Sequence, residues 1–311
     1  MDTTTSRRNF VKATAGGAAA LAALASLRVP QAQAATTETK TEYFAGKANA
    51  RQINDDLWWV GACDKRLALF ENVYPLDHGV AYNSYLLLDE QTVLIDTVDR
   101  SVIGQYFENV EAVLDGRTLD YLIVDHLEPD HASSIGTFVE KHPEAQLVGN
   151  AKTFQMLPQF FDLDLSRAIT VKEGDTLSLG RHVLHFVMAP MVHWPEVMMT
   201  YDSTDKVLFS ADAFGKFGAL DVEEPWLDEA RRYYLNIVGK FGANVQSVLK
   251  KAAGLDIAMI CPLHGPVLTE TIPQVLAVYD LWSRYMPETD GVLVAYASLH
   301  GNTAQAANAL A

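Results

Sequence analysis

The chain has 311 residues, with 24 basic and 39 acidic side chains and a formal net charge of −15 at neutral pH. Such an acidic chain is a poor partner for nucleic acid, whose phosphates would repel it. Hydrophobic residues make up 49% of the sequence, which is ample material for one large core and leaves room for the start of a second domain.

Residues 1–35 have the pattern of an export signal. The segment Ser6–Lys12 reads SRRNFVK, which matches the twin-arginine pattern, and an Ala-rich stretch follows from Ala13 to Leu27. That stretch is too short and too rich in Ala and Gly for a convincing membrane span, and Ala32–Ala34 forms a small-residue cleavage site. We therefore expect twin-arginine export to a periplasmic or extracytoplasmic location. The alternative is an N-terminal membrane anchor, and with cleavage no stable anchor would remain.

Residues 36–287 have the pattern of one α/β domain. Apolar or alternating runs predict strands at Leu57–Ala62, Ala81–Leu88, Thr92–Ile95, Tyr121–Val124, His182–Met188, Val207–Ala211 and Ile257–Ile260. Helical periodicity predicts helices at Ile103–Leu114, Ser133–Lys141, Ala151–Leu157, Leu227–Ile237 and Val245–Ala253. Runs of strands with helices between them favour an αββα sandwich, in which two sheets pack together with helices outside.

The two cysteines of the chain are Cys63 and Cys261, and both lie at the ends of apolar runs. This placement favours buried free thiols over a disulfide framework. Export to an oxidising compartment leaves a bridge possible.

A cluster of potential metal ligands follows the predicted strand at Tyr121–Val124. His126, Glu128, Asp130 and His131 lie within six residues of one another, directly after the strand. An exposed acidic turn that happens to contain two histidines would be the alternative. Four potential ligands so close together at a strand end are typical of a metal site.

Three further candidate ligands lie where later strands stop. His193 follows the alternating strand in APMVHWPE, Asp212 follows VLFSA, and His264 follows the apolar run in ICPLHGP. Each one alone reads as an ordinary loop histidine or turn aspartate. With the first cluster they make seven ligands delivered to one edge of a sheet, which is enough for two metal ions.

The ligand types restrict the metal. Four imidazoles and three carboxylates without a thiolate suit iron, manganese or zinc. Glu128 favours iron, because hydrolytic zinc enzymes of the metallo-β-lactamase type have H-x-H-x-D-H where this chain has H-x-E-x-D-H. The extra negative charge helps to hold iron as it cycles between its ferrous and ferric states.

The chain resembles the flavodiiron proteins, also called A-type flavoproteins, from about Ile53 to Met286. The segments YNSYLLLDE, VLIDTVD, DHLEPDH, APMVHWPE, LFSADAFG and ICPLHGPV occur in the family's order. The resemblance implies a metallo-β-lactamase-like αββα sandwich with a non-haem diiron centre. Two positions depart from the family's pattern, since Asp125 stands where Asn is common and Ala132 where Ser is common. Neither is a ligand, and we expect tuning of the site rather than its loss.

Carried over residue by residue, the resemblance also assigns the ligands. One iron would be held by His126, Glu128 and His193, and the other by Asp130, His131 and His264, with Asp212 bridging the two. Some family members do not use the residue at the position of His131.

The sequence changes character after Pro287. GVLVAYA at Gly291–Ala297 predicts a strand, and the loop that follows it contains Ser298, His300, Gly301, Asn302 and Thr303 before a helix start. Hydroxyl, amide and glycine groups between a strand and a helix N-terminus suit a phosphate. The segment 288–311 therefore resembles the opening of the flavodoxin-like FMN domain of this family. We expect this truncated part to hold FMN poorly, whether the chain is a fragment or an external redox partner replaces the missing part.

The resemblance implies an oxidoreductase that reduces O2 to water or NO to N2O. It also implies an electron-donor redox protein and a head-to-tail homodimer, in which the FMN of one subunit lies beside the diiron site of the other. A zinc-dependent hydrolase of the same fold is one alternative, and an inactive fragment without its electron-supplying domain is another.

The export signal can be tested directly. Replacing both Arg7 and Arg8 by lysine should leave unprocessed protein in the cytoplasm, because the twin-arginine pair is the feature that the export machinery reads. Cell fractionation and the mass of the N-terminus measure this. Normal export and cleavage of the double variant would contradict the twin-arginine interpretation.

Overall fold

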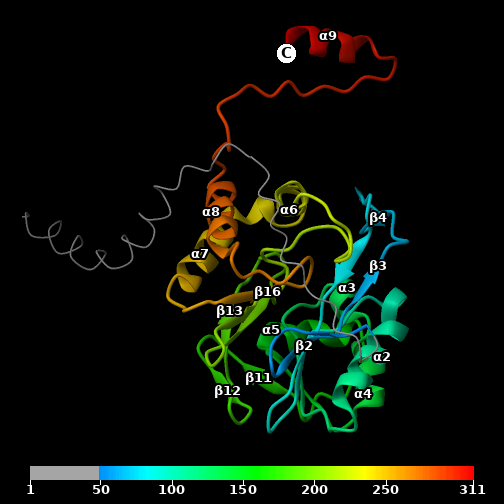
Figure 1. The fold of residues 1–311 in the computed structure, drawn as a ribbon, viewed down its shortest axis with the longest axis vertical. Coiled ribbons are helices and arrows are strands. Elements are labelled where there is room, and N and C mark those ends of the chain that lie inside the picture. Colours follow the sequence, from blue (N-terminus) through cyan, green and yellow to red (C-terminus); the bar gives the residue numbers. More distant parts are fainter. Residues whose placement is uncertain (1–48) are drawn as a thin grey trace, which may run out of the picture.

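The computed structural model describes residues 49–311, which form two β-sheets with helices on their outer sides (Figure 1). The predicted export signal lies outside the described residues. The first sheet has seven strands in the order β1-β2-β7-β8-β9-β10-β11, and the second has five in the order β12-β13-β14-β15-β16. The predicted αββα sandwich is confirmed.

The strands have the following bounds. The first sheet consists of β1 (Arg51–Gln52), β2 (Leu57–Trp59), β7 (Tyr85–Leu87), β8 (Val93–Ile95), β9 (Tyr121–Ile123), β10 (Gln146–Asn150) and β11 (Ile169–Val171). The second consists of β12 (Thr176–Ser178), β13 (Val183–Met188), β14 (Met198–Asp202), β15 (Val207–Phe209) and β16 (Met259–Cys261). Two small sheets pair β3 (Ala62–Asp64) with β6 (Val80–Tyr82) and β4 (Leu69–Phe70) with β5 (Tyr74–Pro75).

The helices lie mainly on the outer sides of the two sheets. They are η1 (Arg100–Val102), α2 (Ile103–Leu114), α3 (Pro129–Ala132), α4 (Ile135–Lys141), α5 (Ala151–Met156), η2 (Leu157–Gln159), α6 (Trp226–Tyr233), the π-helical turn η3 (Tyr234–Val238), η4 (Gly239–Phe241), α7 (Gly242–Ala252), α8 (Ile272–Ser283) and α9 (Asn302–Leu310). None of the described helices is long and apolar enough to cross a membrane.

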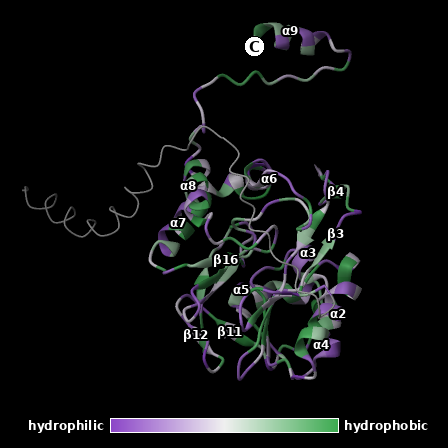
Figure 2. Cartoon of the chain, in the orientation of Figure 1, coloured by the Kyte–Doolittle hydropathy of each residue, from purple (hydrophilic) through white to green (hydrophobic). Residues whose placement is uncertain are grey.

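The alternation of side chains along each strand creates two apolar cores. Leu86, Leu94 and Leu122 point from β7, β8 and β9 into the core under the helices. Their strand neighbours Tyr85 and Ile95 point the other way, into the core between the two sheets. Because the central strands are buried on both faces, they read as nearly continuous apolar runs, and Figure 2 colours them mainly as hydrophobic.

Two predicted strands are divided in the structure. The run at Leu57–Ala62 ends as β2 and resumes as β3, and the run at Ala81–Leu88 is split between β6 and β7 by Asn83 and Ser84. The backbone N–H of Asn83 donates to Leu263 O instead of to a neighbouring strand. Periodicity cannot show such a break, because the residues on both sides of it are equally apolar.

The C-terminal segment corrects one prediction. No strand forms at Gly291–Ala297, where Val292 and Leu293 are 93% and 90% exposed. The physical reason is that no described strand lies beside this segment, and an unpaired strand leaves its backbone hydrogen bonds unmade. The predicted helix start is present as α9, which lies apart from the two sheets in Figure 1.

Both cysteines are free, as predicted. Cys261 is fully buried in β16, and Cys63 is half-buried in β3. Burial raises the pKa of both thiols, which keeps them protonated and unreactive.

The packing at the strand break generates a stability prediction. A Cβ on Gly61 would meet Tyr82 O at 2.2 Å and the Cα of Asn83 at 2.9 Å, and backbone atoms cannot move aside easily. Gly61→Ala should therefore lower the free energy of unfolding by about 1–3 kcal/mol, as overpacking does. Urea unfolding followed by circular dichroism measures this change.

Gly104→Ala is the matched control. Gly104 is exposed in α2 with nothing within 4 Å of an added Cβ, so this variant should keep or gain up to about 1 kcal/mol. Equal stability of the two variants would show that the contact at Gly61 is not tight.

Candidate metal centre

The predicted ligands come from strand ends that meet at one edge of the sandwich. Parallel strands β8, β9 and β10 end side by side, and His126 follows β9. In the second sheet, parallel strands β15 and β16 are followed by Asp212 and His264, and His193 lies in the connection between β13 and β14. Neighbouring parallel strands deliver the residues that follow them to the same edge, so residues far apart in sequence converge.

The loop after β9 is shaped by a buried aspartate that the sequence reading did not identify. Asp96 follows β8 with a φ of 52°, and its Oδ1 accepts hydrogen bonds from the backbone N–H of Asp125 at 2.9 Å and of His126 at 3.1 Å. The chain then turns into the short helix α3, with Pro129 at its first position. The segment expected to be a loop is therefore partly helical, and Asp130 and His131 project from its first turn.

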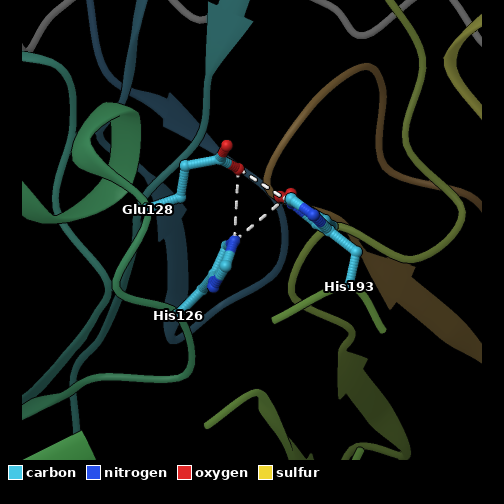
Figure 3. Close-up of side chains that lie close together, drawn as sticks. His126, Glu128 and His193 are labelled. Carbon is cyan, nitrogen blue, oxygen red and sulfur yellow. Dashed lines mark hydrogen bonds and ion pairs between the residues drawn. The ribbon is translucent and has the colours of Figure 1, made fainter. Parts of the chain in front are cut away.

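The first cluster consists of His126, Glu128, His193 and Asp212. His193 Nε2 lies 2.9 Å from Glu128 Oε2 and 3.0 Å from Asp212 Oδ2, and His126 Nε2 lies 3.3 Å from Glu128 Oε2 and 3.5 Å from Asp212 Oδ2. Figure 3 shows the rings of His126 and His193 turned toward the Glu128 carboxylate. All four side chains are buried, and their ligand atoms lie close enough together to hold one ion.

The second cluster consists of Asp130, His131 and His264. Asp130 Oδ2 lies 3.2 Å from His131 Nε2 and 3.1 Å from His264 Nε2. The other oxygen of Asp212, Oδ1, lies 3.2 Å from His131 Nε2 and 3.7 Å from His264 Nε2. Asp212 therefore stands between the two clusters, with one oxygen toward each. The structure brings all seven predicted ligands together, in the two groups that the sequence resemblance implied.

The partners of the outer ring nitrogens show which atoms are available to a metal. His126 Nδ1 donates to Glu196 Oε1 at 2.9 Å, and His264 Nδ1 donates to Ala81 O at 2.7 Å. The Nε2 atoms of both rings are thereby directed inward, as in metal-binding histidines whose other nitrogen is anchored. His131 differs, because its buried Nδ1 has no hydrogen-bond partner.

This arrangement fits a pair of metal cations. The Nε2 atoms of His131 and His264 face each other at 3.0 Å, where two protonated nitrogens would repel and two lone pairs can be held by one cation. Glu128 Oε1 is buried without a hydrogen-bond partner, so the carboxylate has unused capacity for a ligand bond. Carboxylate and imidazole donors in this proportion suit iron, manganese or zinc.

Neighbouring charges shift the pKa values of the clustered side chains. Burial alone would lower the pKa of His193, but Asp212 and Glu128 outweigh it and raise that pKa to about 9. Burial also opposes protonation of His131, yet Asp130 and Asp212 raise its pKa to about 10. Burial would raise the pKa of Asp212, and the neighbouring imidazoles, His126 foremost, hold it well below its usual range. Protons on the imidazoles supply the positive charge that the carboxylates require, and a bound metal would displace them.

Several residues around the clusters were missed by sequence reasoning. Glu196 lies in the segment APMVHWPE, and its Oε1 accepts hydrogen bonds from His126 Nδ1 and from the backbone N–H of Leu127, both at 2.9 Å. The ring of Tyr233 packs 5.4 Å from the His264 ring, and its buried hydroxyl has no hydrogen-bond partner. Exposed Glu71 lies by the cluster, where the neighbouring Glu128 carboxylate raises the pKa of Glu71 to about 8. No local sequence signal marks Tyr233 or Glu71, because the fold alone places them here.

The predicted phosphate loop lies apart from the metal clusters. Gly301 has a φ of 83° at the start of α9, which is the turn expected before a phosphate-binding helix. Exposed residues surround it on both sides: Ser298, His300, Asn302 and Thr303. The structure thus retains the loop-to-helix geometry without any packing around it.

A third group of possible ligands lies elsewhere and is filled by a side chain. His182 Nδ1 is 2.8 Å from Asp202, and its Nε2 is 3.2 Å from Asp56. The Arg181 guanidinium bonds to Asp56 at 2.7 Å and to Asp205 at 2.5 Å. Arginine occupies the place that an ion would take, so this group is an ion-pair network.

With this geometry established, comparison with known proteins identifies the family. The profile described as "ODP family beta lactamase" matches residues 80–265, more than half of the chain. The chain belongs to the ODP beta-lactamase family. Its relatives are flavodiiron proteins, so the family membership expected from the sequence motifs is confirmed.

Individual relatives agree in sequence and in structure. The anaerobic nitric oxide reductase flavorubredoxin of Vibrio vulnificus is 33% identical over 270 residues, covering 83% of this chain and 54% of the relative. The flavodiiron protein of Giardia intestinalis aligns with a TM-score of 0.72 at 28% identity, over 76% of this chain and 59% of that one. Rubredoxin oxygen:oxidoreductase from Desulfovibrio gigas aligns with a TM-score of 0.69 at 30% identity, over 76% and 61%. The chain thus spans about half the length of the flavorubredoxin it matches.

The position of Asp212 between the clusters generates a testable prediction. Among the described residues, Asp212 is the carboxylate within reach of both histidine groups, so Asp212→Ala should reduce metal binding from two ions to one or none. Metal analysis and cobalt titration of the purified variant measure this.

Asp205→Ala is the control for Asp212→Ala. It removes an aspartate from the ion-pair network and should leave two ions bound. Two bound, magnetically coupled irons in Asp212→Ala would show that the ligand assignment is wrong.

Proposed function

We propose that this chain carries the diiron site of an oxidoreductase that reduces O2 to water or NO to N2O. The observation that carries the proposal is the convergence of carboxylates on both histidine clusters, with Glu128 on one, Asp130 on the other and Asp212 between them. Carboxylates stabilise ferric iron better than neutral ligands do, so this donor set suits a metal pair that changes oxidation state. The named relatives support both substrates, because one is a nitric oxide reductase and another an oxygen oxidoreductase.

In this proposal His126, Glu128 and His193 hold one iron, Asp130, His131 and His264 hold the other, and Asp212 bridges them. When bound, the two irons would supply electrons to one O2 molecule or to two NO molecules together. The chain's own part is to position these ligands and to exclude water from them. The aromatic rings of Phe70, Tyr82 and Tyr233 pack against His264 at centroid distances of 5.4, 6.0 and 5.4 Å. These apolar rings keep water away from this ligand.

Glu128 stands where a hydrolytic zinc enzyme would have a third histidine in this loop, which argues against hydrolysis as the main activity.

The same proposal extends to electron supply. The Ser298–Thr303 loop is proposed as the phosphate site of FMN, but its exposure means that these residues alone hold the cofactor weakly. We further propose a redox protein as electron donor, a head-to-tail homodimer, and export by the twin-arginine route.

The proposal predicts a reductase that works without flavin. Loaded anaerobically with ferrous iron, the purified 311-residue chain should contain two irons and little FMN. It should consume O2 or NO when a small artificial reductant is supplied, because such a molecule can reach the metals without a protein partner. Electrode measurements of both gases, with iron and flavin analysis, test this. Two tightly bound zinc ions with lactamase or esterase activity and no gas reduction would establish the hydrolase instead.

A further inference from the structure

The loop that carries His264 is held by the side chain of one buried residue, Asn83. This residue is fully buried at the break between β6 and β7. Its Nδ2 donates to Pro262 O at 2.7 Å and to Gly265 O at 2.8 Å, on the two sides of His264. Its backbone N–H donates to Leu263 O at 2.8 Å. Three carbonyl oxygens of the His264 loop therefore accept hydrogen bonds from one asparagine.

Neighbouring residues fix the direction in which the Asn83 amide points. Trp59 Nε1 donates to Asn83 Oδ1 at 2.7 Å, so the oxygen faces the tryptophan and the NH2 group faces the loop. Tyr85 contributes a parallel bond from its hydroxyl to Pro262 O at 2.7 Å. Every polar atom of the Asn83 side chain is used, and only an amide supplies two donors and one acceptor in this shape.

The same short segment also orients the His264 ring. Ala81 O, two residues before Asn83, accepts from His264 Nδ1 at 2.7 Å, which leaves Nε2 facing Asp130 and His131. The loop has little freedom of its own, since Gly265 adopts a φ of 79° and a Cβ there would meet Lys216 Cγ at 2.7 Å. Residues 81–83 thus fix both the path of the loop and the rotation of the ring.

We propose that Asn83 is the positioning residue for the second metal, acting through the His264 loop and touching neither metal nor substrate. This inference rests on the two-metal site of the proposed function and deepens it by assigning a role to a residue outside the ligand set. His126, Glu128 and His193 of the first cluster lie on other elements, and their loop and the His126 ring are anchored by Asp96 and Glu196. Loss of Asn83 should therefore weaken one metal and spare the other, which a general loss of stability would not do.

The test uses Asn83→Asp, which keeps the shape but turns a carboxylate oxygen toward two carbonyls in place of the NH2 group. Anaerobic titration of the metal-free protein with Co²⁺, followed by visible absorption and calorimetry, should show one site with unchanged affinity. The other should be weakened roughly ten- to hundred-fold, as for other residues that support a ligand histidine. Nitrogen-15 NMR of the metal-free variant should show that the His264 Nδ1–H signal has lost its protection from exchange.

Two further variants complete the design. Asn236→Asp is the matched control, because Asn236 is an exposed asparagine that also donates to a carbonyl, and it should bind both ions as the unmodified chain does. Tyr85→Phe removes one of the two bonds to Pro262 O and should weaken the same single site by less. It decides the question if Asn83→Asp does not fold.

Distinct outcomes separate this inference from the proposed function. Equal affinity at both sites in folded Asn83→Asp and Tyr85→Phe, or equal weakening of both sites, would overturn the role of Asn83. Failure of the unmodified chain to bind a second ion would defeat the two-metal proposal. The NMR signal of His264 in the metal-free protein would still show whether Asn83 holds the ring.

Discussion

Three buried carboxylates surrounded by four imidazoles are the constraint on which the rest of this structure depends. A carboxylate removed from water is costly by several kcal/mol unless positive charge lies beside it. Glu128, Asp130 and Asp212 meet that need through histidines on three separate connections. The two sheets must therefore come together with their strand ends aligned, because any shift along the strands would leave one of these groups buried without its partner.

Hydrogen bonds from the surrounding residues hold the ligand loop and the ligand side chains in fixed positions. Asp96 holds two successive backbone N–H groups at the start of the ligand loop, and Glu196 ties the His126 ring to the connection that also carries His193. Asn150 Nδ2 in turn donates to Glu196 O at 2.5 Å, so the end of β10 supports the same connection. Groups at the ends of β8 and β10 and in the β13–β14 connection thus hold the ligand loop and the His126 ring, and the rigidity of this part of the centre is a property of the sheet edge.

The sequence was informative where an apolar strand pattern is followed directly by side chains that can bind a metal. Apolar runs followed by histidine or acidic side chains predicted β9, β13, β15 and β16 and the seven candidate ligands that follow them. Strands β10, β11, β12 and β14 were not predicted. Asp96, Asn83 and Tyr233 were not predicted, since their roles depend on neighbours about 30 or more positions away in the chain. The strand predicted from the apolar run at Gly291–Ala297 does not form, because no described strand lies beside it. An apolar run carries no information about whether a partner strand is present.

The ion-pair network around His182 and Arg181 lies at the opposite end of the sandwich from the ligands. It joins the turn before β2, through Asp56, to the turns at the ends of β13 and β14 in the other sheet. The two sheets are therefore fastened at both ends, by metal ligands at one and by salt bridges at the other. The second fastening needs no metal, so the strands can keep their alignment while ions enter or leave. Metal loading then fills a frame that the apolar core and this network already hold in place, so chelators should remove the ions without separating the two sheets.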